Sequence, residues 1–162
     1  MKTKDYNKAV HDHSDRIYYF LLKNTRSEEM SKDILQDCFA KLWEKRNEVD
    51  KLKVKSWLFT VAYNTMLNVL KREQKFYHND ENYEDRNSID SHAQFEYKDQ
   101  LDYYLNDLPP VQRSILLLRD VEGYHYPEIA ELLQLSISQV KVYLFRARNK
   151  MKSQLKSLSE AL

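Results

Sequence analysis

The sequence predicts an all-α protein made of two small helical domains joined by a flexible acidic linker. Glycine occurs once and proline three times among 162 residues, which leaves few residues for the tight turns of β-hairpins. Apolar residues recur at helical spacing in several separate stretches, and the last of these stretches has a helix-turn-helix pattern. A chain of this length can form one domain or two compact ones, so the arrangement of the stretches decides between them.

The net charge of +1 hides three segments of different charge. Residues 51–76 and 137–156 are basic, and the second of these segments contains no acidic residue. The intervening residues 77–107 are strongly acidic. A basic, acidic, basic order is typical of a polyanion-binding protein with an acidic connector.

The first domain is expected to span residues 1–76 and to contain three helices. Apolar spacing predicts one helix from Lys8 to about Leu22 and a second that Ser27 or Ser31 can cap. The apolar stripe of the second helix consists of Ile34, Leu35, Cys38, Phe39, Leu42 and Trp43. After a basic link, Ser56 can cap a third helix that runs to about Lys75.

The third helix is expected to have a buried face and an opposite polar face. Its buried stripe is predicted to contain Leu58, Val61, Ala62, Thr65, Val69 and Leu70. The polar side chains recur at intervals of four, four, three and four residues, and they are Thr60, Asn64, Asn68, Lys71 and Lys75. This spacing places them in one row along the helix.

Residues 77–92 are expected to form the linker, because they are acidic and almost free of aliphatic side chains. The second domain is expected to span residues 93–162. Its helical pattern begins near Ala93, is interrupted at Pro109 and Pro110, and stops again before Gly123, where the chain must reverse. Pro127 fits the first turn of the next helix, where its missing amide costs nothing.

Residues 124–151 have the layout of a helix-turn-helix, in which Leu135 fills the turn and Ser136 forms a capping box with Gln139. The inward positions are Ile129, Ala130, Leu132, Leu133, Val140, Leu144 and Ala147. The outward positions of the second helix are Lys141, Tyr143, Arg146, Arg148 and Lys150. Many such helix pairs never touch DNA, but the lack of acidic residues along this helix favours insertion into a major groove.

The chain resembles extracytoplasmic-function (ECF) sigma factors of the sigma-70 family in three blocks, DILQDCFAKLWEKR, SWLFTVAYNTMLNVLKRE and LPPVQRSILLLRDVEGYHYPEIAELLQLSISQVKVYLFRARNKM. The blocks follow in the family's order and cover most of the chain. The resemblance implies a region 2 domain, a linker and a region 4 domain, without the region 3 of larger sigma factors. It also implies that the protein directs bacterial core RNA polymerase to promoter DNA.

Three sets of site residues follow from the resemblance. The helix that would dock on polymerase carries Asp33, Gln36, Asp37 and Trp43, although Trp43 is equally explained as a core residue. The residues matching the reader of the promoter −10 element are Trp57, Thr60, Tyr63, Asn64, Asn68, Lys71, Arg72 and Lys75. The residues matching the reader of the −35 element are Ser138, Gln139, Lys141, Val142, Tyr143, Phe145, Arg146, Arg148 and Lys150.

Within the −10 set, amides can read base edges and lysines can neutralise phosphates, while aromatic rings can stack on extruded bases. The aromatic residues Trp57 and Tyr63 are also explained as packing residues. The chain departs from the family at Asn68, where an aspartate is usual, and at Gln134, where a glycine is usual in the turn. Gln139 and Val142 likewise replace a threonine and a small polar residue, so the preferred −35 sequence is expected to be the protein's own.

The main alternative is a helix-turn-helix transcription regulator whose first domain senses a ligand or dimerises. Binding to core polymerase distinguishes the two. An enzyme is not expected, because the five histidines have no metal or catalytic spacing, Cys38 has no ligand neighbours, and one glycine cannot form a phosphate loop. We therefore expect no cofactor, metal or small-molecule substrate.

No stretch of the sequence approaches the roughly 20 apolar residues of a membrane span, and charged residues interrupt the amino terminus, so the protein is expected to be cytoplasmic.

The resemblance further implies an anti-sigma factor as a partner, either free or membrane-bound. The sequence does not determine how the two domains lie relative to each other. Packing them together would hide both DNA-reading faces.

Overall fold

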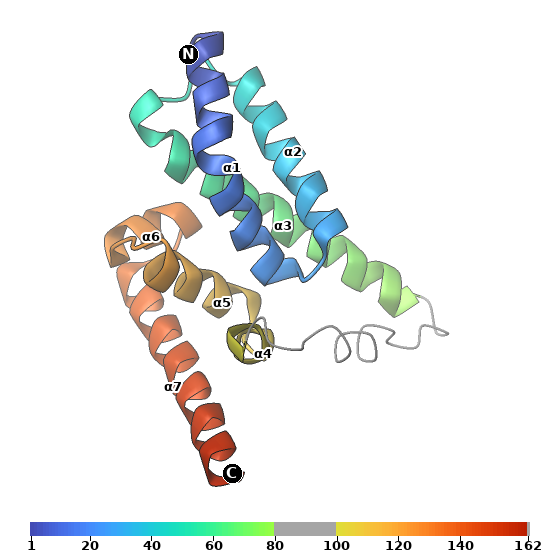
Figure 1. Ribbon diagram of the computed structural model, residues 1–162, viewed down its shortest axis with the longest axis vertical. Coiled ribbons are helices and arrows are strands. Elements are labelled where there is room, and N and C mark those ends of the chain that lie inside the picture. The colour runs from blue at the N-terminus through green and yellow to red at the C-terminus, as the bar shows by residue number, and fades with distance from the viewer. Residues whose placement is uncertain (80–99, 162) are drawn as a thin grey trace.

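The structure is a computed structural model that describes residues 1–79 and 100–161, and every regular element in these ranges is helical. The elements are α1 (Thr3–Thr25), α2 (Glu28–Glu44), η1 (Lys51–Lys53), α3 (Val54–Asn79), α4 (Gln100–Asn106), α5 (Pro110–Leu116), η3 (Leu117–Val121), α6 (Tyr126–Leu133) and α7 (Ile137–Ala161). Helices α1 to α3 form one bundle, and α4 to α7 form a second group beside it (Figure 1). The all-α prediction is confirmed.

Helices α1 and α3 are longer than the sequence pattern predicted, whereas α2 begins at one of its two predicted caps. The chain turns between α1 and α2 at Arg26, whose φ is 57° and whose N–H donates to the Leu22 carbonyl over 2.8 Å. Of the two capping candidates for α2, Ser27 is the cap, because its hydroxyl accepts from the Met30 N–H at 3.1 Å. Ser56 is not a cap, since α3 already begins at Val54.

The carboxyl end of α3 extends into the predicted linker, because the helix continues through residues 77–79. Residues 80–92, the rest of the predicted linker, lie outside the described residues, as does the segment from Ala93 to Asp99. The prediction that a helix resumes near Ala93 is therefore only supported from Gln100 onwards, where α4 begins.

The core of the first bundle contains the predicted stripe of α2, apart from Trp43 and the half-buried Leu35. On α3 the predicted stripe and the buried surface overlap only in part. Leu58, Ala62 and Thr65 are buried as expected, whereas Val61, Val69 and Leu70 are only half-buried, and three side chains outside the predicted stripe are buried. These are Phe59, Tyr63 and Met66. A second set of helices packs against α3, so more of its circumference is covered than one bundle requires.

In the second group, Pro110 opens α5 at the position where a missing amide is harmless. The apolar run 115–118 is buried and passes into the π-helical turn η3. The chain then reverses at Gly123, whose φ of 75° suits glycine. The Tyr124 N–H reaches back to the Leu118 carbonyl at 3.0 Å, which closes this turn before α6.

The helix-turn-helix prediction is confirmed in its local geometry. Ser136 N–H donates to Gln139 Oε1 at 2.9 Å, and Gln139 N–H donates to Ser136 Oγ at 3.0 Å, which is the predicted capping box. The seven inward positions of α6 and α7 are all buried. The turn itself is held by the Leu135 N–H, which donates to the Ala130 carbonyl at 2.9 Å.

Gln134 occupies the left-handed conformation that ends α6, with a φ of 55°. A side chain in this region costs about 1 kcal/mol relative to glycine. We expect Gln134→Gly to raise the free energy of unfolding by about 1 kcal/mol, measured by urea denaturation followed by circular dichroism. Gln154→Gly, in the interior of α7, is the control and should lower it by a similar amount. A destabilised Gln134→Gly variant would contradict the expectation.

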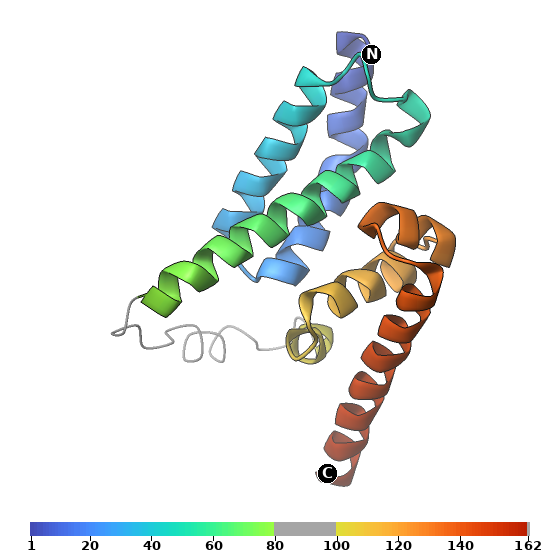
Figure 2. The same cartoon turned by 180° about the vertical axis from the view of Figure 1, so that it is seen from behind.

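The two groups of helices share one continuous core, so the protein is closed rather than extended. Seen from behind, α5 and α6 lie along the side of the first bundle, while the last turns of α7 extend away from it (Figure 2). Ser114 Oγ donates to Asn24 Oδ1 at 3.1 Å, and Lys23 Nζ lies 2.8 Å from Asp102 Oδ1. Polar as well as apolar contacts therefore join the groups.

Candidate nucleic-acid interface

The outer face of α2 exposes the three polar residues predicted to dock on polymerase. Asp33, Gln36 and Asp37 are exposed, because Ile34 and Cys38 on the opposite face enter the core. A negatively charged strip thus lies on a rigid helix.

Trp43 lies at the edge of this face. Its side chain remains 38% exposed. The Tyr6 ring meets it edge-on with centroids 5.0 Å apart, and the Arg46 guanidinium lies 4.1 Å from its ring centroid. Trp43 therefore packs on one side and is open to solvent on the other. A shallow groove of about 580 Å³ between α1 and α2 adjoins Gln36 and is lined by Tyr6, Val10, Leu35 and Phe39.

Part of the predicted polar row on α3 is exposed to solvent, and part is covered by the second group of helices. Asn64, Asn68 and Lys71 of this row are exposed, as is Arg72 beside it. Thr60 is half-buried, and its Oγ1 lies within hydrogen-bond distance of the Leu132 carbonyl of α6, at 3.2 Å. Lys75 belongs to α3, but its side chain lies outside the described part of the chain.

The aromatic residues of the predicted −10 set are not free surfaces in this closed form. Trp57 is half-buried, and Tyr63 is only 6% exposed. Burial raises the pKa of Tyr63, and the neighbouring Tyr143 of α7 raises it further. The first turns of α3 therefore face the helix-turn-helix rather than solvent.

A groove of about 300 Å³ marks where the two groups of helices meet beside the amino end of α3. Trp57 and Thr60 line it from one side, and Tyr124, Glu128 and Leu132 line it from the other. Residues assigned to separate DNA-reading domains thus share one cleft. Sequence periodicity could not reveal this cleft, because its walls are 70 or so residues apart in the chain.

The predicted −35 residues also fall into two groups. Ser138, Lys141, Val142, Phe145 and Arg146 are exposed, and the Phe145 side chain is 66% exposed. Gln139 is exposed too, but its carbonyl oxygen already serves the capping box. Tyr143 is half-buried against the first bundle.

Arg148 and Lys150 are exposed, as their outward positions predicted, but both also contact their own domain. Arg148 Nη2 lies 2.8 Å from Asp120 Oδ1, and this hydrogen bond is the main cause that raises the Arg148 pKa. Lys150 Nζ donates to the Asp107 carbonyl. These two cations in the middle of α7 therefore contact other segments of their own domain.

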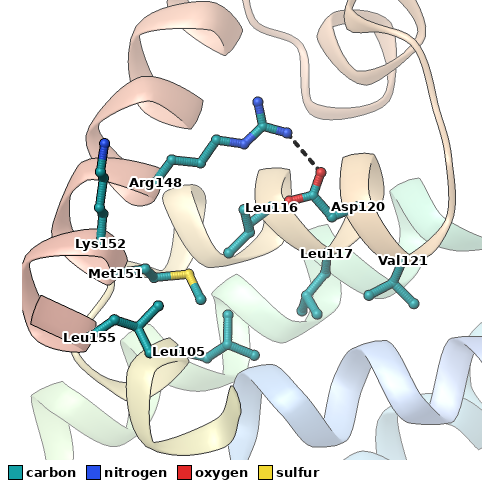
Figure 3. A pocket seen from close by; sticks show the side chains of 9 residues that line it. All are labelled: Leu105, Leu116, Leu117, Asp120, Val121, Arg148, Met151, Lys152 and Leu155. Carbon is teal, nitrogen blue, oxygen red and sulfur yellow. Dashed lines mark hydrogen bonds and ion pairs between the residues drawn. The ribbon is translucent and has the colours of Figure 1, made fainter. Parts of the chain in front are cut away.

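An apolar groove of about 310 Å³ opens between α4, α5, η3 and α7 (Figure 3). Leu105, Leu116, Met151 and Leu155 point into it, and the Arg148–Asp120 ion pair crosses its rim. The sequence pattern did not single out this groove, because α4 and α7 meet only through the fold. It has the size and chemistry to take one or two apolar side chains.

Residues 1–79 and 100–161 contain no group of three His, Cys, Asp or Glu side chains that could hold a metal ion. Within the same residues, none of the helices combines the length and the apolar character that crossing a bilayer requires.

The sequence is similar to known families over both groups of helices. The sequence pattern of sigma-70 region 2 matches residues 9–76, and that of sigma-70 region 4 matches residues 98–151. The chain is 30% identical over 141 residues to the ECF RNA polymerase sigma factor SigM of Bacillus subtilis, covering 85% of this chain and 86% of that protein. It is 28% identical over 156 residues to the sigma factor YlaC of the same species, covering 86% and 85%.

Two solved structures share the fold. The sigma factor RpoE of Bartonella quintana, in complex with the anti-sigma factor NepR, aligns with a TM-score of 0.77 at 22% identity, over 95% of this chain and 98% of that one. CnrH in complex with the cytosolic domain of CnrY aligns with a TM-score of 0.70 at 20% identity, over 96% and 90%. The two family patterns and the similarity to SigM lead to one conclusion: the chain belongs to the sigma-70 family and is an RNA polymerase sigma factor of the ECF type.

Proposed function

We propose that this sigma factor brings bacterial core RNA polymerase to promoters through separate contacts on its two domains. Residues 1–76 would dock on polymerase and read and open the −10 element, and residues 93–162 would read the −35 element. The observation that carries the proposal is the exposed face of α7, where Lys141, Val142 and Arg146 stand on a capped helix-turn-helix scaffold. Such a helix can place its first turns against base edges and its later residues against phosphates.

Polymerase docking would use the exposed face of α2, with Asp33, Gln36 and Asp37 as the contact residues and Trp43 at the edge. The −10 element would meet Asn64, Asn68, Lys71, Arg72 and Lys75, together with Trp57, Thr60 and Tyr63 once the groove beside them opens. We further propose that the protein is not itself an enzyme, needs no cofactor, and acts in the cytoplasm, where polymerase and DNA are.

An anti-sigma factor is proposed as a further partner. The similar RpoE and CnrH structures each hold a partner protein, NepR in one case and the cytosolic domain of CnrY in the other. The chain shares their fold over more than nine tenths of its length. The apolar groove on the second group of helices offers one surface on which a partner could bind.

The test is transcription with purified core polymerase on a pool of genomic DNA fragments. Starts that depend on the added protein are expected, and aligning the DNA upstream of them should reveal two elements. DNA binding without any protein-dependent start, and without binding to core polymerase, would favour the alternative of an ordinary helix-turn-helix regulator.

The docking face gives a separate prediction. Asp37→Arg reverses a charge on the exposed side of α2. The variant loses any attraction between Asp37 and a cation of polymerase, and its arginine is repelled by that same cation. We expect its affinity for core polymerase to fall about tenfold or more, equal to about 1.4 kcal/mol, measured by fluorescence anisotropy of labelled protein. Glu160→Arg, an exposed glutamate near the end of α7, is the matched control. Equal affinities of Asp37→Arg and wild type would remove α2 from the interface.

A further inference from the structure

Glu122 is a nearly buried carboxylate at the junction of the two groups of helices. It follows η3, and its side chain is only 3% exposed. Its Oε2 lies 3.2 Å from Arg16 Nη1 of α1 and 3.2 Å from Lys55 Nζ of α3. Both cations come from the first bundle, whereas Glu122 belongs to the second group, so these ion pairs cross the junction.

Further contacts between the two groups of helices lie next to Glu122. The Tyr124 ring packs edge-on against Phe59 with centroids 5.9 Å apart, and Lys55 Nζ lies 5.3 Å from the centroid of the same Tyr124 ring. A carboxylate withdrawn from water is tolerated only when cations or hydrogen bonds replace its hydration. Here two cations do so, with their own side chains 57% (Arg16) and 34% (Lys55) exposed, and separating the groups would return the Glu122 carboxylate to water.

The cations that hold Glu122 lie next to the surface proposed to bind the −10 element. Lys55 is in the first turn of α3, two residues before Trp57 and five before Thr60. A lysine and an arginine converging on one anionic oxygen is also the arrangement that binds a phosphate oxygen. In the closed form that place is taken by a carboxylate of the same chain.

We propose that Glu122 occupies a DNA phosphate site formed by Arg16 and Lys55, and that it thereby keeps the second domain closed over the amino end of α3. In this form Thr60, Tyr63 and Tyr143 are covered by the opposite domain. DNA competes for the two cations, so binding and opening are linked. The phosphate part of the inference rests on the proposed −10 reading by the first domain, whereas the closure does not.

The closure is tested on the full chain without DNA or polymerase, by small-angle X-ray scattering. A compact chain of this length has a radius of gyration of about 15 Å. Glu122→Gln and, independently, Lys55→Gln are expected to raise the measured radius by about 2 Å or more above that of wild type. Glu160→Gln is the control with the same charge change and should leave the radius as it is. Circular dichroism checks that each variant keeps its helical content.

A charge swap tests whether the pair itself closes the protein. Glu122→Lys alone is expected to open the chain, and adding Lys55→Glu should return part of the lost compactness, because the attraction between these two positions is restored. A double variant as open as Glu122→Lys, or a Glu122→Gln variant as compact as wild type, would overturn the closure.

The phosphate site is tested by fluorescence anisotropy with a labelled single-stranded DNA of about 20 nucleotides. Glu122→Gln is expected to bind about 3- to 10-fold more tightly than wild type, because a larger fraction of the protein is open. Combining it with Lys55→Gln should abolish this gain. An opened Glu122→Gln variant with unchanged affinity would overturn the phosphate site, and neither readout depends on whether the protein initiates transcription.

Discussion

Arg146→Ala is expected to weaken binding to promoter DNA by about 1 to 3 kcal/mol, or about 5- to 150-fold, while leaving affinity for core polymerase unchanged. Arg146 is exposed on α7, one turn beyond the exposed Val142, on a helix whose start is fixed by the Ser136–Gln139 capping box. A guanidinium there can form two parallel hydrogen bonds with a guanine edge or one with a phosphate, and alanine can form neither.

The measurement is a titration of duplex DNA that carries the −35 element recovered from the transcription experiment. Lys152→Ala is the control, since it removes an exposed cation of α7 that lies outside the predicted −35 set. A smaller loss of DNA affinity is expected for the control. Equal binding of Arg146→Ala and wild type would remove Arg146 from the interface. A loss that is uniform across sequences would identify it as a phosphate contact rather than a reader of bases.

Arg113→Ala is expected to lower the free energy of unfolding by about 3 to 5 kcal/mol. The Arg113 side chain is buried at 8% exposure, and its guanidinium donates to backbone carbonyls on several segments. Nε donates to Leu105 O at 2.8 Å, Nη1 to Asn24 O at 2.6 Å, and Nη2 to Leu108 O at 2.9 Å. Removing it takes a buried donor from each of these carbonyls, of which Leu105 O also accepts from the Leu108 N–H, and it leaves a cavity.

Urea denaturation followed by circular dichroism measures this loss. Lys152→Ala, an exposed cation on α7, is the control and should change the free energy of unfolding by less than about 0.5 kcal/mol. Arg113→Lys should recover only part of the loss, because a lysine cannot donate in the planar fork that these carbonyls require. A loss below about 1 kcal/mol for Arg113→Ala would contradict the structural role assigned to this network.

Features that depend on neighbours in the chain were predicted well from the sequence. The inward positions of α6 and α7, the capping box at Ser136 and the exposure of Arg146 all follow from helical periodicity and local hydrogen bonds. The same holds for Asp33 and Asp37, which lie off the apolar stripe of α2 and are exposed. Short-range rules suffice because each of these side chains is placed by its own helix.

Contacts between segments that are distant in the chain were not predicted from the sequence. Tyr63 was expected more as a packing residue than as a stacking surface, and it is buried, but its neighbour Tyr143 was not predicted. Arg113 had no assigned role, although it bridges Asn24 and Leu105. Arg148 is exposed as expected, but its pairing with Asp120 was not predicted. In each case the partner lies far along the chain, where periodicity carries no information.

The sequence by itself determined that the protein is helical, that it contains a capped helix-turn-helix without acidic residues from 137 to 156, and that it resembles ECF sigma factors. Only the tertiary structure decided that the two groups of helices share one core and that Glu122 joins them through Arg16 and Lys55. The reason is physical. Helix formation and capping are set by residues within about four positions of each other, whereas the choice between open and closed domains depends on a small balance of contacts made across the whole chain.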